Sequence, residues 1–320
     1  MSRVFVAGDH GVSVIDTATN TVVATVGAPL RSHPLGIDFD PNLRRVLAAG
    51  LELWAIDAST NQPTGPDVPT GIVTNIAVDP ARGRAFAVAP SICIPLFEST
   101  CDADPQGQIG FINPESLSVT KVIPGAGANL TRVAVDFSTG TIYTVDDDPG
   151  AIDTAVWAWD GGSGALLGHV TVPRAVGGIA IGGRRGYVPR ADHALATKLA
   201  VIDLDTMKEV GEFPIDDTRG PLAQVAFDPF SGKVFAFVAK VGRDVQLVAF
   251  EPVTGVVEGE VPVSGYFPDI AIDTREARAY ISEERAVLVV DTLSLQPIVT
   301  IPVPEGTGAL VFVPAAALSD

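Results

Sequence analysis

The chain consists of short apolar runs separated by turn-forming residues. In the clearest pattern, an acid or amide ends an apolar run and a Ser or Thr follows three residues later. The pair recurs at intervals of 40 to 56 residues, as Asp16/Thr19, Asp57/Thr60, Asn113/Ser116, Asp160/Ser163, Asp203/Thr206, Glu251/Thr254 and Asp291/Ser294. Such side chains close tight turns by hydrogen bonding to nearby backbone. The pattern therefore predicts seven copies of one hairpin.

Two further strand types recur around each hairpin. One has a cation followed two residues later by a bulky apolar residue, as Arg3/Phe5, Arg45/Leu47, Arg84/Phe86, Arg185/Tyr187, Lys233/Phe235 and Arg278/Tyr280, while Thr141/Tyr143 lacks the cation. We expect these cations to form scaffold ion pairs near the hairpin ends. The other type alternates apolar and small residues and runs into Asp, as in Ile76-Ala77-Val78-Asp79-Pro80. A central alanine suits an innermost strand, where neighbouring sheets converge.

These repeats predict an all-β fold, a seven-bladed β-propeller of four-stranded antiparallel blades that forms a single domain over residues 1–320. The first copy lacks an innermost strand, and the missing piece lies at the other end of the chain, at 310–314. We expect residues 308–314 to pair with residues 3–26. That pairing would close the ring and remove an exposed sheet edge.

The units resemble YVTN-type β-propeller repeats, whose consensus runs roughly GVAVDP…GRVYVAN…VSVIDTATNKVVATI. Residues 12–20, VSVIDTATN, match it almost letter for letter. The resemblance covers essentially the whole chain and implies the propeller fold. For function it implies little, because propellers of this type include both enzymes and binding proteins.

Composition narrows the choice of partners. The chain has 320 residues, of which 47% are hydrophobic and 18% charged, with a formal net charge of −17. Such a charge repels phosphate backbones and anionic lipid, so we expect no nucleic-acid or membrane partner. A small-molecule ligand and a monomeric state are the expectation. The chain starts on a strand without a leader, which favours the cytoplasm, whereas a local disulfide between Cys93 and Cys101 would indicate export after removal of a signal.

One face of the ring is expected to carry the function. We call it the top face; it holds the connections that enter innermost strands and those between second and third strands. These connections vary in length, from His10-Gly11 to residues 89–107, as functional loops do. The candidate ligand-binding residues there are His10, Asn75, Arg132, Arg190, Gln224, Arg243, Phe267, Asp269 and Glu283.

The catalytic candidates are Asp38, His33 and His193. Asp38 replaces the small residue of an innermost strand, where a buried carboxylate is costly unless it is paired or protonated. It is either a poised acid or a structural carboxylate bonded to a neighbouring blade. His33 and His193 have the chemistry of acid–base catalysts, or they are hydrated loop residues.

Two acidic segments are candidates for a divalent cation, Ca²⁺ or Mg²⁺. Asp102 and Asp104 partly match a calcium loop, and Asp146 and Asp148 supply charge without its spacing. A solvated loop is the alternative for both. No nucleotide cofactor is expected, because the glycine-rich segment at 161–164 lies in a hairpin rather than between a strand and a helix.

The expected function is a small-molecule enzyme of hydrolase, lyase or cyclase type with a polar pocket at the top of the central channel. A non-catalytic ligand- or protein-recognition module is the alternative. Propeller lactonases that use calcium hold it with a Glu/Asn/Asp set on the axis. Asn75 and Asp269 resemble part of that set, whereas Arg132 and Gln224 depart from it and favour an anion or a neutral polar substrate.

Overall fold

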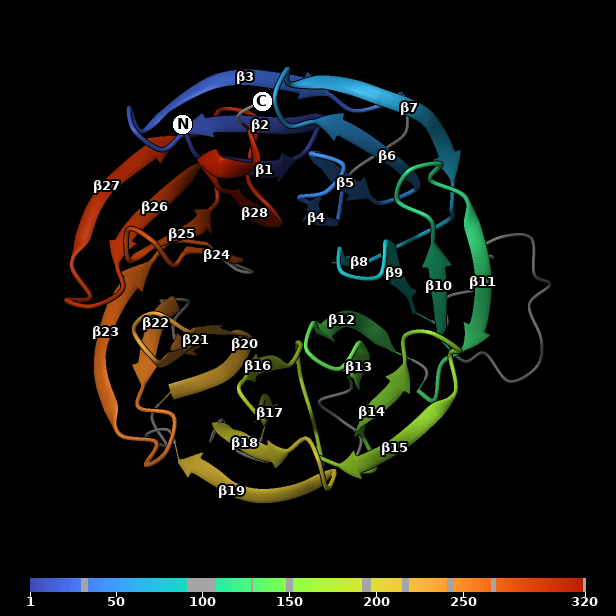
Figure 1. The fold of residues 1–320 in the computed structure, drawn as a ribbon. Helices are drawn as coiled ribbons and strands as arrows, with labels where there is room; N and C mark the ends of the chain where they lie inside the picture. The colour runs from blue at the N-terminus through green and yellow to red at the C-terminus, as the bar shows by residue number, and fades with distance from the viewer. Residues whose placement is uncertain are drawn as a thin grey trace.

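A computed structural model describes the chain except residues 30–33, 91–106, 128, 148–151, 192–196, 215–218, 241–244, 266–268 and 319–320. The described strands form seven four-stranded antiparallel sheets arranged in a ring (Figure 1). The protein is therefore the predicted seven-bladed β-propeller. None of its described helices is long and apolar enough to cross a membrane.

The blades are numbered from the N-terminus, and each has four strands from the axis outward. The innermost strands of blades 1 to 7 are β28 (Leu310–Val313), β4 (Gly36–Asp40), β8 (Asn75–Asp79), β12 (Leu130–Asp136), β16 (Ala180–Gly182), β20 (Arg219–Asp228) and β24 (Ile270–Asp273). The second strands, in the same order, are β1 (Arg3–Gly8), β5 (Arg45–Ala49), β9 (Arg84–Ala89), β13 (Thr141–Asp146), β17 (Arg185–Ala191), β21 (Lys233–Lys240) and β25 (Arg278–Glu283).

The outer half of each blade completes its sheet. The third strands are β2 (Gly11–Asp16), β6 (Glu52–Asp57), β10 (Gln108–Ile112), β14 (Ala155–Asp160), β18 (Thr197–Asp203), β22 (Val245–Phe250) and β26 (Ala286–Asp291). The outermost strands are β3 (Thr21–Gly27), β7 (Gln62–Pro69), β11 (Val119–Pro124), β15 (Leu166–Thr171), β19 (Lys208–Pro214), β23 (Val257–Val263) and β27 (Pro297–Pro302).

The ring closes as predicted. Strand β28 pairs antiparallel with β1, placing Val311 opposite Phe5 and Val313 opposite Arg3. The first and last strands of the chain, β1 and β28, therefore lie side by side (Figure 1). Closure leaves no unpaired second strand in blade 1.

The hydrophobic core is divided among the junctions between neighbouring blades. Buried side chains form a cluster at each of the seven junctions. Between blades 1 and 2, for example, Phe5 and Val14 pack with Trp54. Second and third strands such as β1 and β2 are buried on both faces, whereas outermost strands such as β3 alternate between exposed and partly buried residues. Each blade therefore depends on both of its neighbours for burial.

The predicted hairpins are confirmed in all seven blades. In blade 1, Asp16 Oδ1 accepts the N–H groups of Ala18 and Thr19 at 2.8 and 3.1 Å. The acid or amide of the other blades accepts the equivalent pair of N–H groups. The turns are closed by their own side chains.

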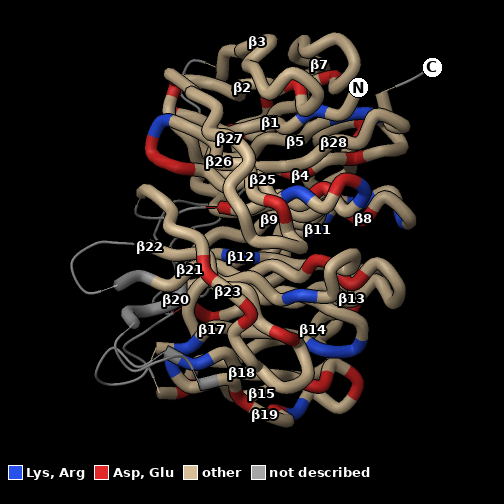
Figure 2. Tube along the Cα trace, turned by 90° about the vertical axis from the view of Figure 1, so that its left-hand side faces the viewer, with Lys and Arg blue, Asp and Glu red and all other residues tan. Residues whose placement is uncertain are grey.

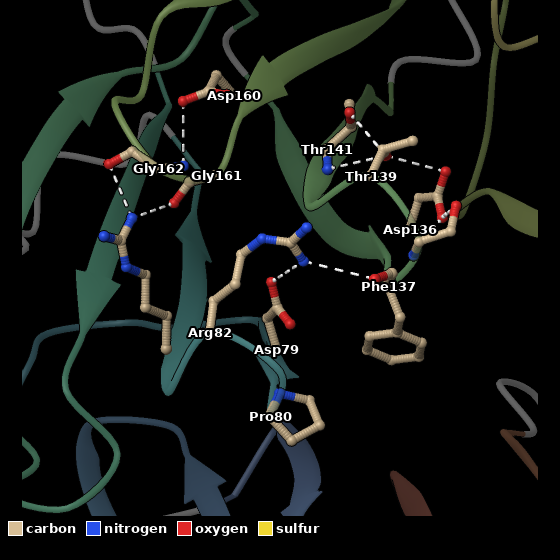
Figure 3. Close-up of polar contacts among 12 residues, drawn as sticks. Asp79, Pro80, Arg82, Asp136, Phe137, Thr139, Thr141, Asp160, Gly161 and Gly162 are labelled. Atoms are coloured by element: carbon tan, nitrogen blue, oxygen red, sulfur yellow. Dashed lines mark hydrogen bonds and ion pairs between the residues drawn. The ribbon is translucent and has the colours of Figure 1, made fainter.

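The second-strand cations do more than form ion pairs. Arg84 Nη1 of blade 3 donates to the carbonyl oxygens of Gly161 and Gly162 in the blade 4 turn, at 2.7 and 2.8 Å (Figure 3). Five other cations reach a carbonyl of the next blade's turn in the same way: Arg3, Arg45, Arg185, Lys233 and Arg278. We call these contacts straps. Lys233 and Arg278 also form the predicted ion pairs, with Glu258 and Glu276.

The blade 3–4 junction has a second link on the bottom face, the side opposite the top face. Arg82 Nη1 donates to buried Asp79 Oδ2 at 3.0 Å and to the Phe137 carbonyl at 3.4 Å (Figure 3). Seen from the side, blue and red segments lie close together beside β8 and β13 (Figure 2). Charges on this face thus take part in joining blades.

Candidate functional site

Innermost strands present unpaired backbone groups to the channel. In an antiparallel ladder, alternate N–H groups point away from the partner strand. On an innermost strand those groups face the axis and the neighbouring blade, so they need another acceptor. We call the residue just before the apolar–small–apolar core the first position. It is occupied in blades 1 to 7 by Ala309, Gly36, Asn75, Arg132, Gly178, Gln224 and Asp269.

Three polar side chains satisfy the N–H groups of the following blade. Asn75 Oδ1 accepts the N–H of Val133 at 3.1 Å, and Asp269 Oδ2 accepts that of Leu310 at 3.0 Å. Asp38, two residues beyond the first position, accepts the N–H of Val78 at 2.7 Å. We call these contacts clasps.

Asp38 is the clasp with unusual electrostatics. Its Oδ1 accepts the N–H of Phe39 at 2.8 Å while Oδ2 holds Val78. Burial raises the pKa of the Asp38 carboxyl to about 6, with a smaller contribution from nearby Asp40, while the two N–H groups act to lower it. Both hydrogen bonds go to backbone, which favours the structural alternative. The pKa nevertheless lies close to neutrality, as catalysis would need.

A cavity of about 150 Å³ opens beside the axis at blades 3 to 6. Its described lining consists of Asn75, Arg132, Val133, Ala134, Gly178, Ile179, Gln224 and Val225. The structure thus brings together three predicted ligand-binding residues, Asn75, Arg132 and Gln224, from three blades. Arg132 is the charged member of this lining.

The stem of Arg132 lies against Gly178 of the next blade. A Cβ at Gly178 would be 3.2 Å from both Cβ and Cγ of Arg132. Contacts this short are tighter than ordinary packing, so a side chain at position 178 would require the Arg132 stem to shift by a few tenths of an ångström. Gly178 therefore provides the space in which Arg132 extends.

Asp147 is an acidic residue that interacts with Arg132. Thr131 Oγ1 donates to Asp147 Oδ2 at 2.9 Å. Burial raises the pKa of the Asp147 carboxyl, while the Thr131 hydroxyl, the Gly177 N–H and the Arg132 charge act in the opposite direction. Arg132 and Asp147 interact electrostatically without an ion pair among the described contacts.

Other predicted ligand-binding residues lie outside the cavity lining. Arg190 forms ion pairs with Glu209 and Glu212 of β19. Glu283 Oε1 accepts the N–H of Ser264 at 2.9 Å, and Asp269 is a clasp. His10 is exposed in the β1–β2 turn.

Several candidates fall outside the described residues: His33, Arg243, His193, Phe267, Asp102, Asp104 and Asp148, together with Cys93 and Cys101. Asp146, the remaining metal candidate, accepts the N–H of Asn129 at 3.2 Å. No group of three or more His, Cys, Asp or Glu side chains suited to a metal ion occurs in the described part of the chain. The Ca²⁺ or Mg²⁺ hypothesis stays a prediction.

Sequence reasoning missed part of the lining. Gly178 carries a signal, because it leaves the first position without a side chain beside a blade whose first position is arginine. Val133, Ile179 and Val225 carry none, since each is an ordinary apolar residue of an innermost strand. Their contribution lies in the backbone, which composition does not reveal.

Comparison with known proteins supports the fold and gives no information on function. No protein-family model matches the chain, and no curated protein matches it. Among solved structures, Kuenenia stuttgartiensis hydrazine synthase aligns over 92% of this chain and 90% of its own, with a TM-score of 0.67 and 14% identity. The dehydrogenase NirN, in complex with DHE, aligns over 96% and 74%, with a TM-score of 0.62 and 16% identity. A chain of the nidogen/laminin complex aligns over 98% and 99%, with a TM-score of 0.58 and 12% identity.

These neighbours include enzymes and a protein–protein complex that share the propeller architecture. At such low identity the likeness concerns the fold alone. Function must therefore be argued from the site.

Proposed function

We propose that this protein binds a small polar molecule in the axial cavity of blades 3 to 6. The observation that carries the proposal is the convergence of Asn75, Arg132 and Gln224 around a volume of about 150 Å³. An apolar cavity of about that size holds a molecule as large as benzene, with six non-hydrogen atoms. We infer further that the blades are YVTN-type repeats, on the match of residues 12–20 to that consensus.

Catalysis is the second candidate, and one observation favours it. The Asp38 carboxyl, with its pKa raised to about 6, is suited to proton transfer near neutral pH. Asp38 is absent from the described cavity lining, so the described geometry favours binding over a hydrolase, lyase or cyclase reaction. Recognition of a protein on the top face would use loops rather than the cavity.

The test is a thermal-shift screen of small polar metabolites against wild type and Gln224→Leu. This change keeps the side-chain size and removes the amide facing the cavity. We expect the metabolites that raise the melting temperature of wild type to lose that effect in Gln224→Leu, because an unpaired polar group on the ligand is costly.

Gln296→Leu is the matched control, because Gln296 is exposed in the β26–β27 turn. It should respond to ligand as wild type does. A screen with no stabilising compound, or with equal stabilisation of wild type and Gln224→Leu, would contradict binding in this cavity.

A further inference from the structure

We infer that the axial cavity selects a small anion, with a carboxylate as its binding group. This inference rests on the proposed function and concerns the chemical class of the ligand. It follows from the hydrogen-bond donors that the lining brings together, one of which is charged.

The clasp fixes the orientation of the Asn75 amide. Its Oδ1 is occupied by the Val133 N–H at 3.1 Å. The NH₂ group is therefore the part of the amide left for a ligand, since an amide has one acceptor oxygen and one donor nitrogen. Asn75 thus offers donors to the cavity it lines.

The backbone of blades 5 and 6 offers two more donors. Ile179 and Val225 directly follow the first position, as Val133 and Leu310 do, and the N–H groups of those two are held by clasps. For Ile179 the preceding blade supplies Arg132, which has no acceptor atom. For Val225 it supplies Gly178, which has no side chain. Among the described contacts, therefore, no clasp holds Ile179 or Val225, and both line the cavity. Ile37 of blade 2 faces Ala309 and likewise has no clasp among those contacts, but it lies outside the described cavity lining.

Arg132 adds the charge. Its guanidinium presents a planar fork of donors that matches a carboxylate, and it stays protonated at any physiological pH. The net charge of −17 does not cancel this attraction, because distant surface acids are screened over about 8 Å at physiological ionic strength. Arg132, the Asn75 NH₂ group and the two backbone N–H groups together form a donor-rich cradle. Gln224 can donate to a second polar group of the ligand.

Asp147 opposes an incoming anion. Burial raises the pKa of the Asp147 carboxyl and the Arg132 charge acts in the opposite direction, so the ionised form of Asp147 competes for the same guanidinium. Removing the Asp147 charge should therefore tighten anion binding, whereas removing the Arg132 charge should weaken it. A merely structural role for these residues would not produce opposite signs.

Lactate and lactamide are suitable probes, because they have the same size of about six non-hydrogen atoms and differ in charge. Binding is followed by ¹H–¹⁵N NMR of the full chain, with acetate and inorganic phosphate as further anions. Titration extends to about 20 mM, well above the roughly millimolar Kd expected for so small a ligand. We expect lactate to shift the amide signals of Ile179 and Val225, and lactamide to leave them in place.

The variants give the decisive comparison. Arg132→Gln should weaken lactate binding about tenfold to a hundredfold, and Asp147→Asn should strengthen it. Arg184→Gln is the matched control, since the Arg184 side chain is 77% exposed and paired with Asp205; it should bind lactate as wild type does. Stronger binding of phosphate than of lactate or acetate would overturn the assignment to carboxylates in favour of tetrahedral anions.

The anion inference is overturned if lactamide binds as well as lactate, or if no anion shifts Ile179 or Val225. In that case, a neutral metabolite that stabilises wild type but not Gln224→Leu would still support the proposed function. Failure of both the anion titration and the metabolite screen would remove the proposed function as well.

Discussion

Asp38 and Asn75 perform the same task with different chemistry. Each accepts a backbone N–H from the next blade, at 2.7 Å to Val78 and 3.1 Å to Val133. A neutral amide is enough for blade 3, yet blade 2 carries a carboxylate whose pKa burial raises to about 6. Asp38 also accepts the N–H of Phe39 through its other oxygen, a bond that an amide nitrogen in that place would not accept. Groups kept at a cost to stability are found at functional sites, so a catalytic role for Asp38 stays a hypothesis.

We predict that the free energy of unfolding of Asp38→Asn, relative to that of wild type, rises as the pH is raised from 4 to 7.5. The folded-state pKa of about 6 exceeds the ordinary value of 3.8 for a free carboxyl. The folded state therefore binds a proton more tightly than the unfolded state, and this contribution is complete below about pH 4 and lost as pH rises through 6. At one pKa unit per 1.36 kcal/mol, the charged carboxylate costs about 3 kcal/mol at neutral pH.

The measurement is the free energy of unfolding of both proteins between pH 4 and pH 7.5. The difference in the free energy of unfolding between variant and wild type should grow as the pH rises from 4 to 6. The other carboxylates are common to both proteins, so their pH dependence cancels in this difference. A difference independent of pH would show that Asp38 titrates normally. A variant with wild-type stability and altered ligand binding would support the functional role.

At the scale of elements, the straps link each strand pair to the next blade. We predict that Arg84→Gln lowers the free energy of unfolding by about 1–3 kcal/mol, the usual contribution of hydrogen bonds from a charged donor. Arg84 holds two carbonyls, those of Gly161 and Gly162. Arg184→Gln, which breaks the exposed pair with Asp205, should change it by less than about 1 kcal/mol.

Urea unfolding of the two variants checks the prediction. Equal effects would mean that the strap contributes no more than a surface ion pair. The Thr141 position of blade 4 offers an internal comparison, because the second strand there has no cation to reach blade 5.

The elements show what the sequence could and could not predict. The seven hairpins were predictable because their acid and hydroxyl residues lie within three residues of each other and bond locally. The carbonyl group that accepts from Arg84 was not predictable. It belongs to Gly161, which is 77 residues away in the sequence and comes close only because blades 3 and 4 are neighbours in the ring. Asn75, Arg132 and Gln224 were selected from their place before an innermost strand. The place of Gly178 after an arginine blade is visible in the sequence, but its contact with the Arg132 stem depends on how the two blades pack.

At the scale of the whole molecule, clasps and cavity occupy largely different parts of the ring, and the blade 1–2 junction has neither among the described contacts. Clasps join blades 2 to 3, 3 to 4 and 7 to 1, through Asp38, Asn75 and Asp269. Around blades 4 to 6, Arg132, Gly178 and Gln224 take the first positions and the cavity opens there. The symmetric repeat thus provides the scaffold, and its departures provide the candidate site.

Closure of the ring is the property on which every junction depends. Strand β28 contributes to both neighbouring cores, with Val311 and Val313 packed toward blade 2 and Leu310 toward blade 7. Deleting residues 307–320 would expose β1, whose Val4 and Phe5 are fully buried. We predict that the truncated chain aggregates or unfolds, because an exposed apolar edge pairs with other chains. Size-exclusion chromatography with light scattering and thermal melting would report it.

A peptide of residues 307–320 added in trans should restore a monomeric ring with the wild-type melting transition, because the missing strand needs only to pair with β1. The same peptide with Val311→Pro is the control. Leu310 N–H bonds to Asp269 toward the axis, so the alternating ladder directs the Val311 N–H toward Phe5 of β1. Proline lacks that donor and should fail to rescue. A truncated chain that stays monomeric and equally stable, or rescue by the proline peptide, would contradict closure through this strand.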